Sequence, residues 1–257
     1  MNFSILDLTI ILPAFLAGVL VLATHVPLGA EVLKRGIVFI DLAIAQIAAL
    51  GVIVADMTVP DTHGALVQIA AGVAAVLGAL LLTWTEKRWP EVQEAQIGVL
   101  FILAASGGLL LLAHNPHGGE HLRDLLAGQI LWVRPEQLWL PALGTVAILA
   151  LLYFYGQRLG RLGFYLLFAL AVTASVQLVG VYLVFASLIV PSLGVRQYRA
   201  SRRLPLAYTI GIAGYASGLL LSVVFDLPSG ALIVWCLAAL AITVYAAGPR
   251  AGSVTEK

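Results

Sequence analysis

The sequence predicts an all-α protein, a polytopic bundle of transmembrane helices with about eight or nine spans. Apolar residues make up 61% of its 257 residues, charged residues only 11%, and the mean hydropathy is +1.02. A soluble domain is nearer half apolar and a quarter charged. The apolar residues also fall in runs of about 20, the length that an α-helix needs to cross a bilayer. We therefore expect residues 1–257 to form one transmembrane domain.

Nine stretches of the chain have the composition of a span. In order they are 8–26, 37–55, 65–84, 97–113, 137–155, 163–180, 181–195, 206–225 and 230–247. The division between the sixth and seventh spans does not follow from length alone, because residues 163–195 are too long for one straight crossing and short for two. Gly180 in the middle and Pro191 near the end favour a full helix followed by a broken or half helix.

Basic residues predict the orientation of these spans, because cytoplasmic loops carry an excess of lysine and arginine. They cluster after alternate spans, at Lys34/Arg35, Lys87/Arg88, Arg158/Arg161, Arg196/Arg199/Arg202/Arg203 and Arg250. Placing these loops in the cytoplasm leaves the N-terminus and the loop at 114–124 outside. Arg123 and Arg134 are exceptions, since both fall in the outer loop.

Two patterns indicate how the helices meet each other and the lipid. In GIAGYASG, Gly214 and Gly218 stand four residues apart, and Gly211 and Ala207 continue the stripe. Such small-residue faces let helix backbones approach closely, either within one chain or at a homodimer seam. The tryptophans at predicted span ends are typical of the membrane interface; they are Trp84, Trp89, Trp132 and Trp139.

Asp41 and Gln46 are the polar residues of the second span, within the apolar run GIVFIDLAIAQIAALG. A carboxylate at the centre of a bilayer costs roughly 2.5–3.5 kcal/mol, so an acid there is a functional hypothesis by default. Two interpretations are open for Asp41. It lies on a transport pathway, or it lies at a helix end near the membrane interface.

The most metal-like group is the histidine loop, in which His114, His117, Glu120 and His121 fall within eight residues. Three imidazoles and a carboxylate suit a borderline divalent cation such as zinc. Pro116 and the glycine pair at 118–119 predict a loop rather than a helix. The group is a defined metal site, a loose collector of cations, or simply a solvated loop. His25, at the end of the first span, is interpreted as structural.

The sequence excludes several functions. It contains no GxxxxGKS or GxxxxGKT segment, so it has no phosphate-binding loop of its own and is not expected to hydrolyse ATP. GxSxG, HExxH and CxxC are absent as well, and we expect neither an enzyme nor a bound cofactor. A net charge of +1 without a basic aromatic patch gives no indication of nucleic-acid binding.

Four segments, in this order, resemble the permease subunits of the bacterial ABC importers for zinc, manganese and iron. They are LGAEVLKRGIVFIDLAIAQIAALG (28–51), EAQIGVLFILAASGGLLL (94–111), LRDLLAGQILWV (122–133) and VQLVGVYLVFASLIVPSLGVR (176–196), with a weaker fifth match in DLPSGALIV (226–234). The first is similar to a Gly-Asp-Ala-x-x-His helix closed by Pro-Gly. The fourth is similar to Val-Gly-x-x-Leu-Val-x-x-Leu-Leu-x-Pro.

The second span departs from that family pattern. The acid of the family falls on Leu42 and its histidine on Gln46, Asp41 takes the place of the preceding glycine, and Leu50 replaces the proline. The carboxylate has therefore shifted by one residue, about 100° around a helix. Either Asp41 and Gln46 form a different polar gate, or the substrate or the gate chemistry differs.

The resemblance implies the membrane-spanning subunit of an ABC importer for a divalent metal ion, zinc or manganese, in the bacterial inner membrane. It implies a homodimer in lipid with the pathway along its two-fold axis, a periplasmic metal-binding protein and a cytoplasmic ATP-binding subunit. Asp41 and Gln46 would face the pathway. The alternative is a stand-alone proton-coupled cation carrier that uses Asp41; a structural scaffold would leave this acid without a purpose.

The contact with the ATPase is expected near the third and fourth spans. The family usually has a longer cytoplasmic stretch between the fifth and sixth spans. This chain has only YGQRLGRLGF (155–164) there. The remaining candidates are Trp89 and Glu94, in KRWPEVQEAQIG, and the basic turn at 196–203. Pro90 is suited to the first turn of a short interfacial helix, and Trp89 offers an apolar anchor.

Overall fold

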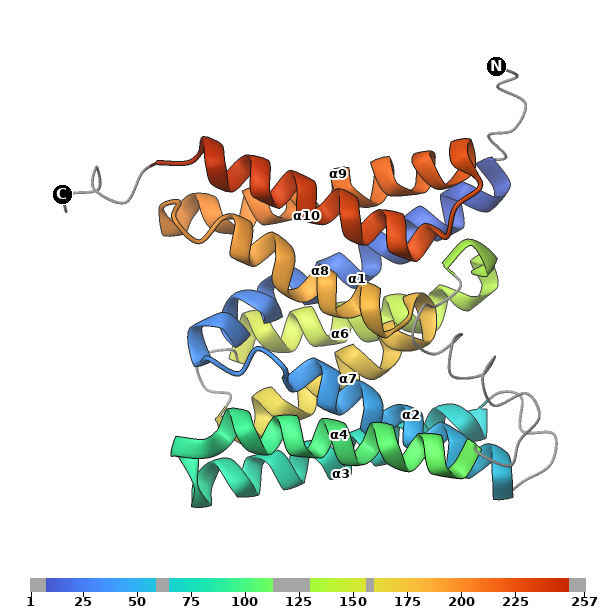
Figure 1. Cartoon of the computed structure of the whole chain (residues 1–257), viewed down its shortest axis with the longest axis vertical. Coiled ribbons are helices and arrows are strands. Elements are labelled where there is room, and N and C mark those ends of the chain that lie inside the picture. Colours follow the sequence, from blue (N-terminus) through green and yellow to red (C-terminus); the bar gives the residue numbers. More distant parts are fainter. Residues whose placement is uncertain (1–7, 59–64, 113–129, 156–159, 250–257) are drawn as a thin grey trace.

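The computed structural model describes residues 8–58, 65–112, 130–155 and 160–249 (Figure 1). Within these ranges the chain forms nine α-helices and three short 3₁₀ segments, which confirms the all-α class. The α-helices are α1 (Leu8–Arg35), α2 (Ile40–Thr58), α3 (Ala65–Arg88), α4 (Gln93–Leu112), α6 (Trp139–Tyr155), α7 (Arg161–Val179), α8 (Val181–Gly194), α9 (Ala200–Phe225) and α10 (Ser229–Ala247). The 3₁₀ segments are η2 (Pro90–Val92), η3 (Ile130–Trp132) and η4 (Pro135–Gln137).

Each predicted span coincides with one of these helices. Across the described ranges, seven helices are long and apolar enough to cross a membrane, whereas the apolar helices at Ile40–Ala55 and Val181–Gly194 are shorter. The break between α7 and α8 falls at Gly180, whose φ of 82° is readily adopted only by glycine. The prediction of a full helix followed by a short one is therefore confirmed. Pro191, however, lies inside α8 and does not end it.

Helix α1 is longer than its predicted span, because it continues through Pro27 to Arg35. A proline inside a helix leaves the carbonyl four residues earlier without its usual donor, and here that carbonyl belongs to Ala23. The Tyr208 hydroxyl of α9 donates a hydrogen bond to the Ala23 carbonyl oxygen at 2.9 Å. A neighbouring helix thus satisfies the group that the proline leaves free, which is how membrane helices tolerate proline.

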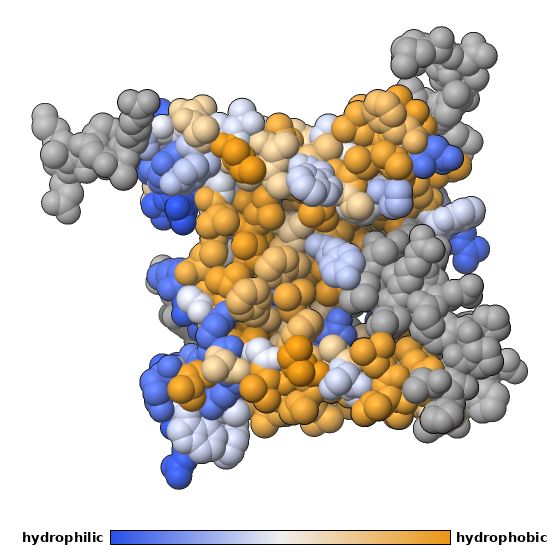
Figure 2. All heavy atoms as spheres, in the orientation of Figure 1, coloured by the Kyte–Doolittle hydropathy of each residue, from blue (hydrophilic) through white to orange (hydrophobic). Residues whose placement is uncertain are grey.

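The helices pack in layers that are visible in Figure 1. Helix α10 packs on α9 and α8, and α1 packs on α8 and α9; on the opposite side, α2 packs on α3 and α4. Helices α6 and α7 lie between these groups, and α7 contacts α3. The connections that carry the basic residues between α1 and α2, α3 and α4, and α8 and α9 share one end of the bundle, called here the basic end. Figure 2 shows an apolar surface whose hydrophilic residues gather mainly at this end.

The small-residue stripe of α9 is occupied within the chain. A Cβ added at Gly214 would lie 3.2 Å from the Leu237 Cα, and one added at Gly218 would lie 2.5 Å from the Ile233 Cα. Both neighbours belong to α10, and Gly211 faces Leu22 of α1 in the same way. Of the two alternatives for this stripe, the structure supports packing within one chain.

Candidate functional site

Asp41 lies in the first turn of α2 and is 1% exposed. It therefore lies at a helix end, as one interpretation required, and is nevertheless enclosed by protein. Neither carboxylate oxygen makes a hydrogen bond of ordinary geometry, although the backbone N–H groups of Asp41 and Leu42 lie close by. The positive end of the helix dipole favours a carboxylate at this position. A buried carboxylate without full hydrogen bonding is costly and can accept a cation.

Gln46 is also buried, at 7% exposed, and follows Asp41 by five residues on the same helix. Five residues turn an α-helix by about 500°, so the two side chains leave α2 about 140° apart and about 7.5 Å apart along its axis. The two polar groups therefore point to different neighbours within the protomer. That they line a pathway together stays a prediction.

The start of α4 is tied to the start of α2. The Glu94 Oε1 atom accepts a hydrogen bond from the Phe39 backbone N–H at 3.3 Å, and Phe39 precedes α2 directly. The second oxygen, Oε2, is buried and has no hydrogen-bond partner among the described residues. Glu94 therefore faces the connection between α1 and α2 rather than the outer surface of the basic end.

Trp89, unlike Glu94, faces the outside of the protein. It is 41% exposed and lies edge to face with Trp84, with 5.4 Å between the ring centroids. The short helix predicted to open at Pro90 is present as the 3₁₀ segment η2. The two residues predicted to contact an ATPase thus lie near each other in the chain, but only Trp89 faces outward.

Side-chain contacts at the basic end connect the helices further, and the sequence did not reveal them. The Arg35 guanidinium lies 4.2 Å from the centroid of the Phe164 ring, which joins α1 to α7. Arg161 of α7 pairs with Glu86 of α3 at 3.5 Å. The Gln93 side chain donates to the Tyr165 hydroxyl at 3.3 Å. Only the pair of Arg35 with Glu31 has a sequence signal, namely spacing of four residues in a helix.

The histidine loop, with His114, His117, Glu120 and His121, lies outside the described residues. Its predicted role in collecting metal is therefore untested. Among the residues that are described, no three side chains of histidine, cysteine, aspartate or glutamate come together as a potential metal site.

His25 is not at the end of a helix, because α1 continues to Arg35. Its side chain is 0% exposed, and its Nδ1 atom lies 3.0 Å from the Val21 carbonyl oxygen. The Thr24 hydroxyl oxygen also lies 3.0 Å from Nδ1. The other ring nitrogen, Nε2, is buried, and no residue in the described part of the chain hydrogen-bonds to it.

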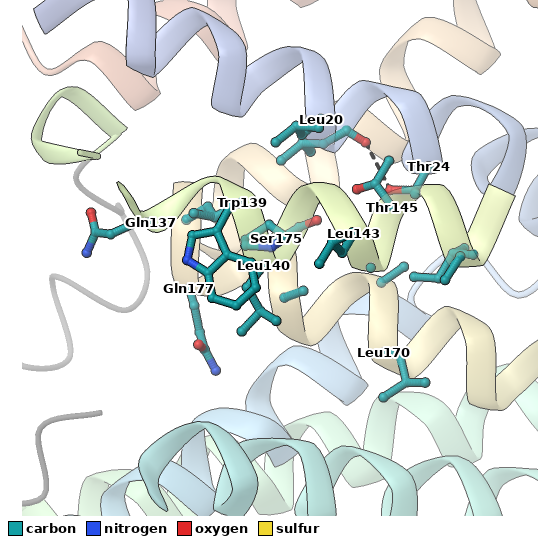
Figure 3. Close-up of a pocket in the computed structure, with 18 of the residues that line it drawn as sticks. Leu20, Thr24, Gln137, Trp139, Leu140, Leu143, Thr145, Leu170, Ser175 and Gln177 are labelled. Atoms are coloured by element: carbon teal, nitrogen blue, oxygen red, sulfur yellow. Dashed lines mark hydrogen bonds between the residues drawn. The ribbon is translucent and has the colours of Figure 1, made fainter. Parts of the chain in front are cut away.

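A cavity of about 760 Å³ opens between α1, α6 and α7, with Gln68 of α3 also in its lining (Figure 3). In Figure 3, Gln137 and Gln177 lie at one end of the cavity, and Thr24 and Thr145 lie toward the other. Sequence reasoning missed this cavity because it depends on how loosely α6 packs on its neighbours. Over its described length, Ile148 is the only buried residue of α6.

The fold and these buried polar groups are typical of the membrane subunit of a transport system. The profile of the ABC 3 transport family matches residues 7–164 and 156–248, and the chain belongs to this family. The resemblance found in the sequence is thereby confirmed. The chain is a multi-pass membrane subunit of a bacterial ABC transport system and not an enzyme.

Individual relatives and a solved structure extend over nearly the whole chain. The chain is 29% identical over 252 residues to the manganese transport system membrane protein MntC of Halalkalibacterium halodurans, covering 89% of this chain and 84% of that protein. It is 22% identical over 252 residues to the high-affinity zinc uptake system membrane protein ZnuB of Haemophilus influenzae, covering 90% and 95%. The fold is similar to PsaBC from Streptococcus pneumoniae in complex with Fab, with a TM-score of 0.76, 20% identity and 95% of both chains covered.

Proposed function

We propose that this chain is the permease of an importer for a divalent metal ion, manganese or zinc. The observation that carries the proposal is Asp41, a buried carboxylate at the start of α2 for which the described residues supply no counter-ion. Relatives named for manganese and for zinc transport support the choice of substrate. A carboxylate suits a divalent cation, and a site for transport must bind weakly enough to release the ion. Gln46 would offer an amide oxygen about 7.5 Å further along the axis of α2.

The proposed assembly contains two copies of this chain, a cytoplasmic ATP-binding subunit and a periplasmic metal-binding protein. The histidine loop would gather metal ions on the outer side without taking part in translocation. On the inner side, the exposed Trp89 and η2 would contact the ATPase. Glu94 would pass movement of this contact to Phe39, two residues before Asp41, through the hydrogen bond of 3.3 Å.

The proposal is tested by metal accumulation in cells that lack their own permease and express variants of this chain with its partners. Asp41→Ala and Asp41→Asn should both lose most uptake at normal membrane abundance, because charge rather than size attracts the cation. Asp226→Asn is the matched control. Asp226 is exposed and adopts the left-handed conformation after α9, which asparagine also tolerates.

Near-normal uptake by Asp41→Ala would show that the acid has only a structural role. Uptake that persists without the ATPase, and that depends on a proton gradient, would instead favour the carrier alternative. Co-purification of an ATP-binding subunit with the chain would distinguish these two outcomes directly.

A further inference from the structure

An open groove of about 350 Å³ lies between α8 and α10, where both helices end at the basic end (Figure 1). The two helices approach closely at Gly194 and Ala241, because a Cβ added at Gly194 would lie 2.8 Å from the Ala241 Cβ. The apolar walls around these two buried residues are Val190 and Leu193 from α8, and Ala238 and Ile242 from α10. Leu193 and Ile242 are exposed, so the groove opens at the surface of the bundle.

A positive charge lies at the rim of this groove. Arg196 and Tyr245 are its lining residues nearest the basic end. The Arg196 guanidinium lies 5.1 Å from the centroid of the Tyr245 ring and donates to the Tyr245 hydroxyl at 3.2 Å. These contacts hold the guanidinium in place, and no carboxylate among the described residues pairs with it. The rim therefore offers an oriented cation whose partner the described part of the chain does not supply.

The turn that carries Arg196 is fixed to the end of α10 and adds further positive charge. The Tyr198 hydroxyl donates to the Val244 carbonyl oxygen at 2.8 Å. Arg199 and Arg202 follow in the chain, and both are exposed. Their positive charge predicts that this end faces the cytoplasm, and the cytoplasmic leaflet carries the anionic lipids that attract basic segments.

The dimensions of the groove suit part of an acyl chain. Seven residues of α10 separate Ala238 from Tyr245, which corresponds to about 10 Å along the helix. That length is about a third of a hydrocarbon layer of roughly 30 Å. A chain lying in the groove would thus begin at the level of Arg196 and extend toward the middle of the membrane.

We infer that the groove binds an anionic phospholipid of the cytoplasmic leaflet, with an acyl chain between α8 and α10 and the phosphate on Arg196. A guanidinium matches the geometry of a phosphate, and basic pockets between membrane helices on the cytoplasmic side bind anionic headgroups. The inference goes beyond the proposed function and does not depend on it, because neither the metal ion nor ATP takes part.

A second copy of the chain suits this groove less well than a lipid. A two-fold axis beside the groove would bring two arginine-rich turns together, and like charges across an interface are unfavourable. The basic end has few free carboxylates to compensate. Glu31 already pairs with Arg35. Glu86 already pairs with Arg161. An anionic lipid instead supplies both the apolar chain and the negative charge.

The test uses native mass spectrometry of the purified complex of this chain with its partners, after removal of lipid in detergent. Phosphatidylglycerol and phosphatidylethanolamine with identical acyl chains are titrated separately. The unaltered complex should bind phosphatidylglycerol at the lower concentration, because only this lipid carries a net negative charge. Soluble glycerophosphoglycerol, which has the same headgroup without acyl chains, should not displace it.

Arg196→Gln is the discriminating variant for the headgroup. Glutamine keeps a polar side chain beside Tyr245 but removes the charge. The affinity for phosphatidylglycerol should fall about fivefold, with little change for phosphatidylethanolamine. Arg202→Gln is the matched control, because it removes the same charge from an exposed position outside the lining and should cost much less.

Ala238→Leu tests the apolar part of the groove at constant charge. Ala238 is a half-buried lining residue, so a leucine there would occupy the space of the acyl chain and lower the affinity for phosphatidylglycerol. Ala239→Leu is the control, because Ala239 is exposed on the same helix and lies outside the lining. Leucine suits a helix nearly as well as alanine does, so both variants should fold.

Four results would overturn the inference. Equal affinity of the unaltered complex for the two lipids would do so without any variant. Equal losses in Arg196→Gln and Arg202→Gln would mean that only diffuse surface charge attracts the lipid. Displacement by glycerophosphoglycerol would leave a phosphate site without a bound chain. Separation of two copies by Ala238→Leu in light scattering, with lipid binding unchanged, would assign the groove to a second copy.

Discussion

Gly218→Ala tests the packing that joins α9 to α10. Gly218 is buried, and an added methyl group would lie 2.5 Å from the Cα of Ile233, 2.6 Å from its Cγ1 atom and 2.7 Å from its backbone nitrogen. The Cα and the nitrogen are backbone atoms, so a change of the Ile233 rotamer cannot relieve the clash. Gly72, in the interior of α3, is the control, because an added Cβ there meets no atom within 4 Å.

The expected cost follows from these distances. Carbon atoms pack at about 3.5–4.0 Å, so the new methyl group overlaps Ile233 by about 1 Å and the two helices must separate by a similar amount. Overpacking of this kind costs about 1–3 kcal/mol. Gly72→Ala should instead raise the free energy of unfolding by about 0.5–1 kcal/mol, because alanine loses less backbone entropy in a helix.

The assay is denaturant unfolding in mixed micelles, read together with the oligomeric state from light scattering. Gly218→Ala should unfold more easily while keeping the oligomeric state of the unaltered chain. An equal stability of the two glycine variants would refute the close approach of α9 to α10. Normal stability combined with dissociation into single chains would show that the stripe is a seam between copies.

Three further outcomes are expected. Tyr208→Phe should lower the free energy of unfolding by about 1–3 kcal/mol, since it leaves the Ala23 carbonyl unsatisfied; an unchanged unfolding curve would contradict this. Trp89→Ala should weaken co-purification of the ATPase, because this exposed side chain would contact it. Glu94→Ala should leave the ATPase bound but reduce metal-stimulated ATP hydrolysis. If both variants changed both readouts equally, the two residues would not have separate roles. Replacing the three histidines of the histidine loop with alanine should raise the metal concentration for half-maximal uptake, and complete loss at saturating metal would mean an obligatory site.

The sequence predicted the helices well because their signal is local. Runs of apolar residues locate each span, and Gly180 locates the break between α7 and α8 through its own backbone freedom. The end of α1 was predicted too early because Pro27 and the polar residues after it resemble the end of a span. The hydroxyl of Tyr208 that satisfies α1 at this point lies 185 residues away in the chain, so no local pattern could reveal it.

The candidate site could be predicted only in part, for a similar reason. The sequence identified Asp41 and Gln46 as unusual, and helix geometry alone gives their separation of about 140° around α2. The orientation of Glu94 toward Phe39 depends on the packing of α4 against α2, which hydropathy does not determine. The environment of His25 was missed because it follows from the true length of α1, which continues past this residue to Arg35.

Phe39 connects the basic end of the bundle to Asp41, the proposed metal ligand, and to α8. Its backbone N–H binds Glu94, and its ring stacks on Phe185 of α8, with parallel planes and centroids 6.3 Å apart. Helix α8 in turn packs closely on α1 at Gly29, one helical turn after His25. A displacement of the start of α4 would therefore reach the start of α2 through Glu94 and would reach α8 through the ring of Phe39. Because Phe39 makes both contacts, we expect α2 and α8 to move together rather than in separate steps.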